Sequence, residues 1–225
     1  MIQERVLYAS TIENFMDKLE DLMQEYDFPP QLIFNFDETM LDPGHPHVKV
    51  ISHAKYPHFF VETAAKKEHI SFGFTTSASG QFLQLMYILP LIYLSLLSQE
   101  VINFFAISEQ ETSFITKKLF LKHVKNVLIL AVKRIWQSLD NPKQWTLYLV
   151  DSHSSRDFVE AIKKCEDNYI LVLYYPVHTS TILQLLDLTI NKTLKYALQD
   201  NFEPLSNESK LDKHSRLLFI SVFCL

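Results

Sequence analysis

The sequence predicts an α/β protein built on a mixed β-sheet flanked by helices. Three short apolar runs of strand character come first, and two more then alternate with segments of helical period. Hydrophobic residues make up 48% of the 225 residues, which is enough for one sizeable core. Consecutive strands favour antiparallel pairing, whereas strands joined through a helix pair in parallel. The predicted order is therefore strand-strand-strand-helix-strand-helix-strand-helix.

The first half of the chain opens with a predicted amphipathic helix over Ile12–Tyr26, which Pro29 and Pro30 end. Three predicted strands follow at Ile33–Asp37, His69–Thr76 and Gln81–Leu89. The last two flank Ser77–Gly80, and a glycine-containing loop of this length is typical of a β-hairpin. The three strands are therefore expected to form a meander.

The second half alternates helices and strands. Its predicted elements are a helix over Lys117–Leu139, a strand over Thr146–Val150, a helix over Ser155–Asp167, a strand over Ile170–Tyr174 and a helix over Thr181–Leu198. Asn141 and Pro142 end the first helix, and Pro176 ends the second strand. These strands extend the meander into a mixed sheet.

Composition excludes several classes of function. The net charge of -5 argues against a self-sufficient nucleic-acid binder, which needs a basic surface. Two cysteines are too few for a disulfide framework, and three glycines are too few for phosphate-cradling loops of the Walker or Rossmann kind. The most apolar stretch, Phe82–Leu97, is interrupted by Pro90 and polar residues, so we expect no membrane span. The chain starts without a signal peptide and is expected to be intracellular.

Asp37, Asp151 and Asp187 each stand at the end of an apolar run. The strand or helix that each run forms should bring the aspartate side chain to a shared edge. A carboxylate in such a position is costly to bury unless something pairs with it, and a divalent cation is one such partner. Alone, Asp37 is also compatible with a turn or helix cap, and Asp187 with an exposed helix face.

The flanking sequences resemble the catalytic domain of the DDE-superfamily transposases, in the pogo, Tigger and Jerky-like group related to centromere protein B. The resemblance covers about residues 20 to 198. Five motifs follow in the family's order: Asn35–Thr39 is similar to N-x-D-E-T, Ser77–Gly80 to S-A-S-G, Phe114–Phe120 to G-W-M-T-x-x-x-F, Asp151–Ser155 to D-G-H-S-S, and Tyr175–Ser180 with Leu183–Asp187 to L-P-P-H-T-S and L-Q-P-L-D. Ser152 stands where the family has Gly, and Leu185 where it has Pro.

The resemblance implies an RNase H-like fold in which Asp37, Asp151 and Asp187 hold two divalent cations, Mg²⁺ or Mn²⁺, with Asp37 bridging them. It implies an endonuclease that performs phosphodiester hydrolysis and strand transfer on DNA in the nucleus. The implied domains are a linker helix at 1–28, the RNase H-like catalytic domain at 29–200, and a tail at 201–225 that is polar and then apolar.

Several further residues could support the site, and some of them have two interpretations. His153 and His178 lie beside the acidic motifs, where they could position a phosphate or a water, or serve a structural role. Lys117, Lys118, Lys122 and Lys125 could contact DNA or form the solvated face of a helix. Glu38 and Thr39 are expected to support the turn structurally.

The alternative function is a domesticated or decayed transposase domain that binds DNA or protein partners without catalysis. An aspartyl-phosphate phosphatase is excluded, because Asn35 occupies the position of the nucleophile. The family normally carries helix-turn-helix modules ahead of the catalytic domain, and the segment before Ile12 is too short for one. We therefore expect a homodimer or a separate DNA-targeting module as a partner.

Overall fold

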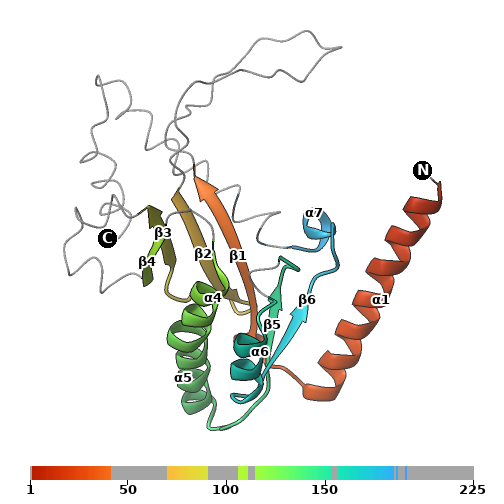
Figure 1. Ribbon diagram of the computed structural model, residues 1–225. Coiled ribbons are helices and arrows are strands. Elements are labelled where there is room, and N and C mark those ends of the chain that lie inside the picture. Colours follow the sequence, from red (N-terminus) through yellow and green to blue (C-terminus); the bar gives the residue numbers. More distant parts are fainter. Residues whose placement is uncertain are drawn as a thin grey trace, which may run out of the picture.

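The computed structural model describes residues 2–41, 70–90, 106–110, 115–153, 157–184, 186 and 191 (Figure 1). Within them, a single twisted sheet is covered by helices on both faces. This arrangement confirms the predicted α/β class with an RNase H-like mixed sheet. The predicted tail at 201–225 lies outside the described residues.

The sheet has six strands in the order β4-β3-β2-β1-β5-β6. Their bounds are β1 Ile33–Leu41, β2 Ile70–Ser77, β3 Met86–Pro90, β4 Ala106–Gln110, β5 Thr146–Val150 and β6 Ile170–Tyr174. The pairs β1–β2 and β2–β3 are antiparallel, whereas β3–β4, β1–β5 and β5–β6 are parallel. The meander and its parallel extension through helical crossovers are thus confirmed, with β1 at the junction between them.

Two strand predictions were wrong. No strand was predicted at β4, because Ala106–Gln110 is short and mixed in polarity. The third strand begins at Met86 rather than Gln81, and before it only Phe82 forms an isolated bridge with Thr76. The hairpin turn itself is confirmed: Gly80 has φ 86° and its N–H donates to the Ser77 carbonyl at 2.9 Å.

One face of the sheet is covered by α4 (Lys117–His123), the π-helical segment η2 (Val124–Leu128), α5 (Ile129–Leu139) and α6 (Val159–Glu166). The predicted helix over Lys117–Leu139 is present but contains this π-helical segment, which apolar periodicity does not reveal. Phe36 of β1 packs edge-on against Phe120 of α4, with ring centroids 5.6 Å apart. Phe34 belongs to the same buried core.

The opposite face carries a smaller core under α1 (Ile2–Tyr26) and the short helix α7 (Ser180–Leu183), whereas Leu32 of the 3₁₀ turn η1 (Pro30–Leu32) belongs to the larger core. Phe15 of α1 packs against Tyr175 at 5.6 Å between ring centroids. Leu147, Leu149 and Leu173 of β5 and β6 complete this core. Alternation along β1 therefore assigns Asn35 and Asp37 to this face, because Phe34 and Phe36 point to the other.

The remaining helix predictions agree in part. Helix α1 starts earlier than Ile12, and α6 starts at Val159. Of the predicted helix over Thr181–Leu198, the structure shows α7, which ends at Leu183, a non-helical Gln184, and helical backbone at Leu186 and Asn191. Positions 185, 187–190 and 192–198 lie outside the described residues. Among the described residues, no helix is long and apolar enough to span a membrane.

Candidate active site

Asp37 and Asp151 follow the aligned part of two neighbouring parallel strands. The last aligned pair of β1 and β5 is Asn35 with Leu149, and each aspartate comes two residues after its member of that pair. Asp37 lies within β1, whereas Asp151 directly follows β5. That these carboxylates meet in one site stays a prediction.

Tyr175 directly follows β6, next to Asp151. The last aligned pair of β5 and β6 is Val150 with Tyr174, so Asp151 and Tyr175 follow next to each other. The Tyr175 N–H donates to the Val150 carbonyl at 2.9 Å, which continues the ladder. Burial, with a further contribution from the negative charge of Asp37, raises the pKa of the Tyr175 hydroxyl well above its usual range. The sequence analysis missed Tyr175 as part of the site, since a tyrosine after a strand is usually a core residue.

Asp37 is held by Asn191. The carboxylate has only 4% of its surface exposed, and its Oδ2 accepts a hydrogen bond from the Asn191 side-chain amide. Asn191 is equally buried, at 3% exposed. A hydrogen bond to a buried carboxylate stabilises its charged form. Asn191 was also missed, although it lies four residues after Asp187, which is one turn of the helix that the sequence predicts.

A cavity of about 230 Å³ opens beside Asp151. It is lined by Asp151, Ser152, His153, Tyr175, Pro176 and His178. Both histidines named from the sequence therefore reach the same cavity as the second acid, and both are exposed. His178 adopts φ 64° in the turn after β6. Ser152 is not among the described residues with positive φ, so the backbone conformation at this position does not require glycine.

The donor set of the described pair fits a hard divalent cation. Asp37 and Asp151 offer carboxylate oxygens, which Mg²⁺ and Mn²⁺ prefer, and Oδ1 of Asp151 is buried in the site. Asp187 lies outside the described residues. Within the described part of the chain, no cluster of three or more histidine, cysteine, aspartate or glutamate side chains is grouped for metal binding. The three-acid set therefore stays a prediction.

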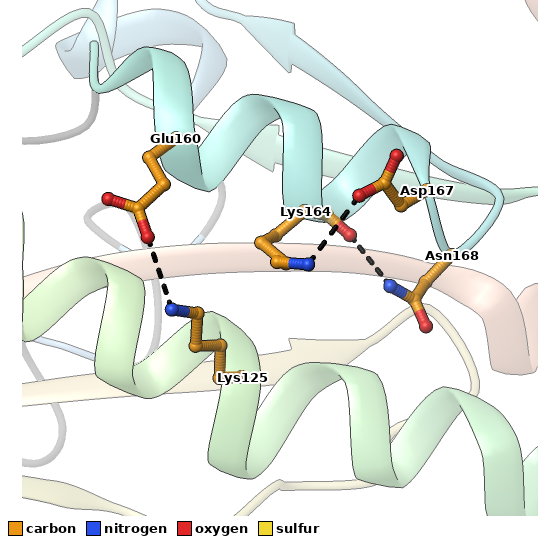
Figure 2. Close-up of polar contacts among 5 residues, drawn as sticks. All are labelled: Lys125, Glu160, Lys164, Asp167 and Asn168. Atoms are coloured by element: carbon orange, nitrogen blue, oxygen red, sulfur yellow. Dashed lines mark hydrogen bonds and ion pairs between the residues drawn. The ribbon is translucent and has the colours of Figure 1, made fainter.

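The lysines named from the sequence lie on the other side of the sheet. Helix α4 packs against Phe36, whereas the Asp37 side chain belongs to the opposite face. Lys125 forms an ion pair with Glu160 of α6, with 3.2 Å between Nζ and Oε1 (Figure 2). The other three, Lys117, Lys118 and Lys122, are exposed on α4. The structure does not bring these lysines together with the acids.

Glu38 has the structural role predicted for it, but from a strand rather than a turn. Its side chain points away from Asp37, and Oε1 accepts a hydrogen bond from the Ile115 N–H at 3.0 Å. This contact ties β1 to the segment that leads into α4. Thr39 is buried, with 2% of its surface exposed.

Comparisons with known proteins agree with this architecture. The model of the DDE superfamily endonuclease family matches residues 99–218, just over half of the chain. The catalytic domain of Mos1 mariner transposase aligns with a TM-score of 0.52 at 14% identity, over 92% of this chain and 84% of that one. The Mos1 transposase paired-end complex with left transposon end gives 0.52 at 13% identity, over 92% and 56%. A pre-cleavage Mos1 transpososome gives 0.51 at 13% identity, over 94% and 58%. No curated protein matches.

The fold is thus an RNase H-like mixed sheet, similar to that of the Mos1 mariner transposase catalytic domain. The chain belongs to the DDE superfamily of endonucleases. It spans a little over half the length of the complete Mos1 chains. The matched segment contains Asp151 and Asp187, whereas Asp37 precedes it. Membership of the pogo, Tigger and Jerky-like group stays a prediction from the motifs.

Proposed function

We propose that this chain is a transposase-derived endonuclease that hydrolyses phosphodiester bonds in DNA and transfers the resulting strands, with divalent cations as cofactors. The observation that carries the proposal is the parallel register of β1 and β5, which aligns Asn35 with Leu149, two residues before Asp37 and Asp151. The third carboxylate would be Asp187. In the predicted helix over Thr181–Leu198 it shares a face with Asn191, whose amide reaches Asp37.

The metal-holding residues would be Asp37, Asp151 and Asp187. Two bound cations, Mg²⁺ or Mn²⁺, would activate an attacking oxygen and stabilise the leaving one in an in-line displacement at phosphorus. The amide of Asn191 fixes the orientation of the Asp37 carboxylate.

The cavity beside Asp151 would receive the phosphate. His153 and His178 line this cavity, where an imidazole can donate a hydrogen bond to a phosphate oxygen or orient a water. The Tyr175 hydroxyl stays protonated at neutral pH, because its pKa is raised, and is therefore a hydrogen-bond donor.

DNA binding would need help from outside this site. The net charge is -5 and the exposed lysines of α4 lie across the sheet from the acids, so they would contact a distant part of the duplex. A second copy of the chain or a separate DNA-targeting module would supply the remaining phosphate contacts. With a DNA substrate of this kind, the protein would act in the nucleus.

Nicking of a supercoiled plasmid with Mg²⁺ or Mn²⁺ tests the proposal. We expect Asp37→Asn, Asp151→Asn and Asp187→Asn each to reduce nicking to background. The matched control is Asp167→Asn, which removes an exposed carboxylate that pairs with Lys164 on α6 at 3.6 Å (Figure 2). That variant should nick like the unmodified chain. Nicking that survives Asp37→Asn, or a folded protein that does not nick, would overturn the catalytic proposal and favour a non-catalytic transposase-derived domain.

A further inference from the structure

A surface cavity lies beside α5, on the face of the sheet opposite to the Asp37 side chain. It has a volume of about 440 Å³ and lies between residues 81–84, ahead of β3, and the helical segments η2 and α5. Its lining includes two large apolar side chains at the surface, Phe82 at 56% exposed and Leu130 at 47% exposed. Exposed apolar side chains that gather in one patch mark an interaction surface more often than isolated ones do.

The helical segment that borders this cavity is strongly basic. Residues 117–139 contain six basic residues and no acidic one, although the whole chain has a net charge of -5. Arg134 lines the cavity, and Lys133 and Arg134 are both exposed. They follow Leu130 by three and four residues, which is one helical turn. Within the described part of the chain, neither of them forms an ion pair. The apolar cavity is therefore flanked by positive charge.

The complementary pattern occurs on α1. Residues 13–25 contain five acidic residues and one basic residue, and all six are exposed. Met16 and Met23, 47% and 37% exposed, are seven residues apart and share one face of the helix. Glu13 precedes Met16 by three residues and Glu20 follows it by four, so both are its neighbours on the helix surface. α1 thus presents an apolar side chain flanked by negative charge.

We propose that the cavity binds α1 of a second copy of this chain. Met16 of that copy enters the cavity beside Phe82 and Leu130. The carboxylates of its α1 pair with Lys133 and Arg134. Methionine is flexible and polarizable, so it fills irregular apolar spaces well. Opposite charges around an apolar contact steer the association and fix its register.

Nucleic acid is the alternative partner of a basic surface. Its phosphate backbone would neutralise the basic side chains but would leave Phe82 and Leu130 without apolar contacts. The combination of an apolar cavity with a basic border therefore favours an acidic helix that carries an apolar side chain.

The two surfaces lie on opposite faces of the sheet, because α1 covers one face and α5 the other (Figure 1). A contact between different surfaces of two identical chains is heterologous. Each added copy leaves one cavity and one α1 available, so association continues beyond a dimer until a ring closes. Neither surface contains Asp37 or Asp151, so this inference does not rest on the proposed function.

Sedimentation velocity of the full chain, with a chelator and without DNA, tests the inference. We expect the average mass to rise with protein concentration between about 1 and 100 μM and to exceed that of a dimer at the upper end. Salt at about 1 M, where the Debye length is about 3 Å, should shift the mass toward that of the monomer. A chain that stays monomeric over this range would overturn the inference.

Charge reversal identifies the two surfaces. The cavity variant carries Lys133→Glu with Arg134→Glu, and the α1 variant carries Glu13→Lys with Glu20→Lys. All four side chains are exposed, so folding should be unaffected. Each variant alone should stay monomeric, because like charges then meet. An equimolar mixture should associate again, because the intact cavity of the α1 variant meets the intact α1 of the cavity variant. A mixture that stays monomeric would overturn the proposed pairing.

Two further variants separate the apolar contact from general electrostatics. Met16→Gln keeps every charge and should weaken association by about tenfold. The matched control, Lys117→Glu with Lys118→Glu, makes the same change of charge at exposed positions of α4 that do not line the cavity, and should associate like the unmodified chain. Equal weakening by the control and the cavity variant would overturn the assignment to the cavity. An unmodified chain that stays monomeric, with a cavity variant that loses binding to a DNA duplex, would identify nucleic acid as the partner instead.

Discussion

The hydrogen bond between Asn191 and Asp37 should contribute measurably to stability, because it offsets part of the free-energy cost of burying a carboxylate. The perturbation is Asn191→Leu, which keeps a similar volume while removing the amide donor. Asp37 is 4% exposed, so water cannot replace the lost hydrogen bond without opening the structure. Hydrogen bonds to charged groups contribute about 1.5–3 kcal/mol, and we expect a loss of that size in the free energy of unfolding.

A double-mutant cycle isolates the interaction. In the Asp37→Asn background the partner of Asn191 is neutral, so Asn191→Leu should cost only about 0.5–1.5 kcal/mol. The assay is urea unfolding at neutral pH in the presence of a chelator, so that metal binding does not contribute. The matched control is Asn168→Leu, whose amide donates to the Lys164 carbonyl at 2.8 Å near the end of α6 (Figure 2).

The cost of Asn168→Leu should be the same in both backgrounds, because its partner is a neutral carbonyl far from Asp37. An equal cost of Asn191→Leu in the two backgrounds would refute the reasoning. It would mean that Asn191 stabilises the helix or its packing rather than the charge of Asp37.

Three further predictions follow from buried or paired side chains. Burial lowers the pKa of His123 to about 4, so the unfolded chain binds more protons between about pH 6.5 and 4. This contribution to the free energy of unfolding is present above pH 6.5 and is lost as the pH falls toward 4. His123→Gln, which can still bond Thr75, should make the free energy of unfolding, measured with urea, fall less steeply across this range. Cys165 is fully buried and burial raises its pKa to about 12, so mass spectrometry should find it unmodified by iodoacetamide at pH 8 until the protein unfolds. The exposed pair of Lys125 with Glu160 should contribute at most about 1 kcal/mol, so Lys125→Gln should barely shift the urea midpoint, and a large shift would contradict this.

The sequence predicted most of the fold because its strands are continuous apolar runs bounded by clear turn signals. β5 and β6 have the predicted bounds, since each is a short, largely apolar run between turn signals: Asn141 and Pro142 precede β5, and Pro176 follows β6. β4 was missed because Ile107 is its only large apolar residue, and its pairing partner β3 decides its conformation. The π-helical turn after His123 was missed for a similar reason, because its cause lies in packing rather than in periodicity.

The candidate site residues were predictable where an ionisable side chain follows an apolar run in the sequence. Asp37 and Asp151 each follow an apolar run, and each comes two residues after the aligned pair of Asn35 and Leu149. Asn191 carries no such signal, because an amide in a helix resembles any other polar residue of the sequence. Its role depends on the group that it meets after folding, which is the buried Asp37 carboxylate.

The two described acids differ in how firmly the fold holds them, and the difference comes from strand length. β1 has nine residues and extends beyond the five of β5, so Asp37 lies within a ladder that continues to Leu41 against β2, whereas Asp151 follows the last residue of its strand. Asp37 is correspondingly buried and Asp151 only partly so. A metal pair would therefore find its bridging ligand prepositioned by the sheet. The remaining adjustment would fall to the loop after β5, and substitutions there should alter metal affinity more than stability.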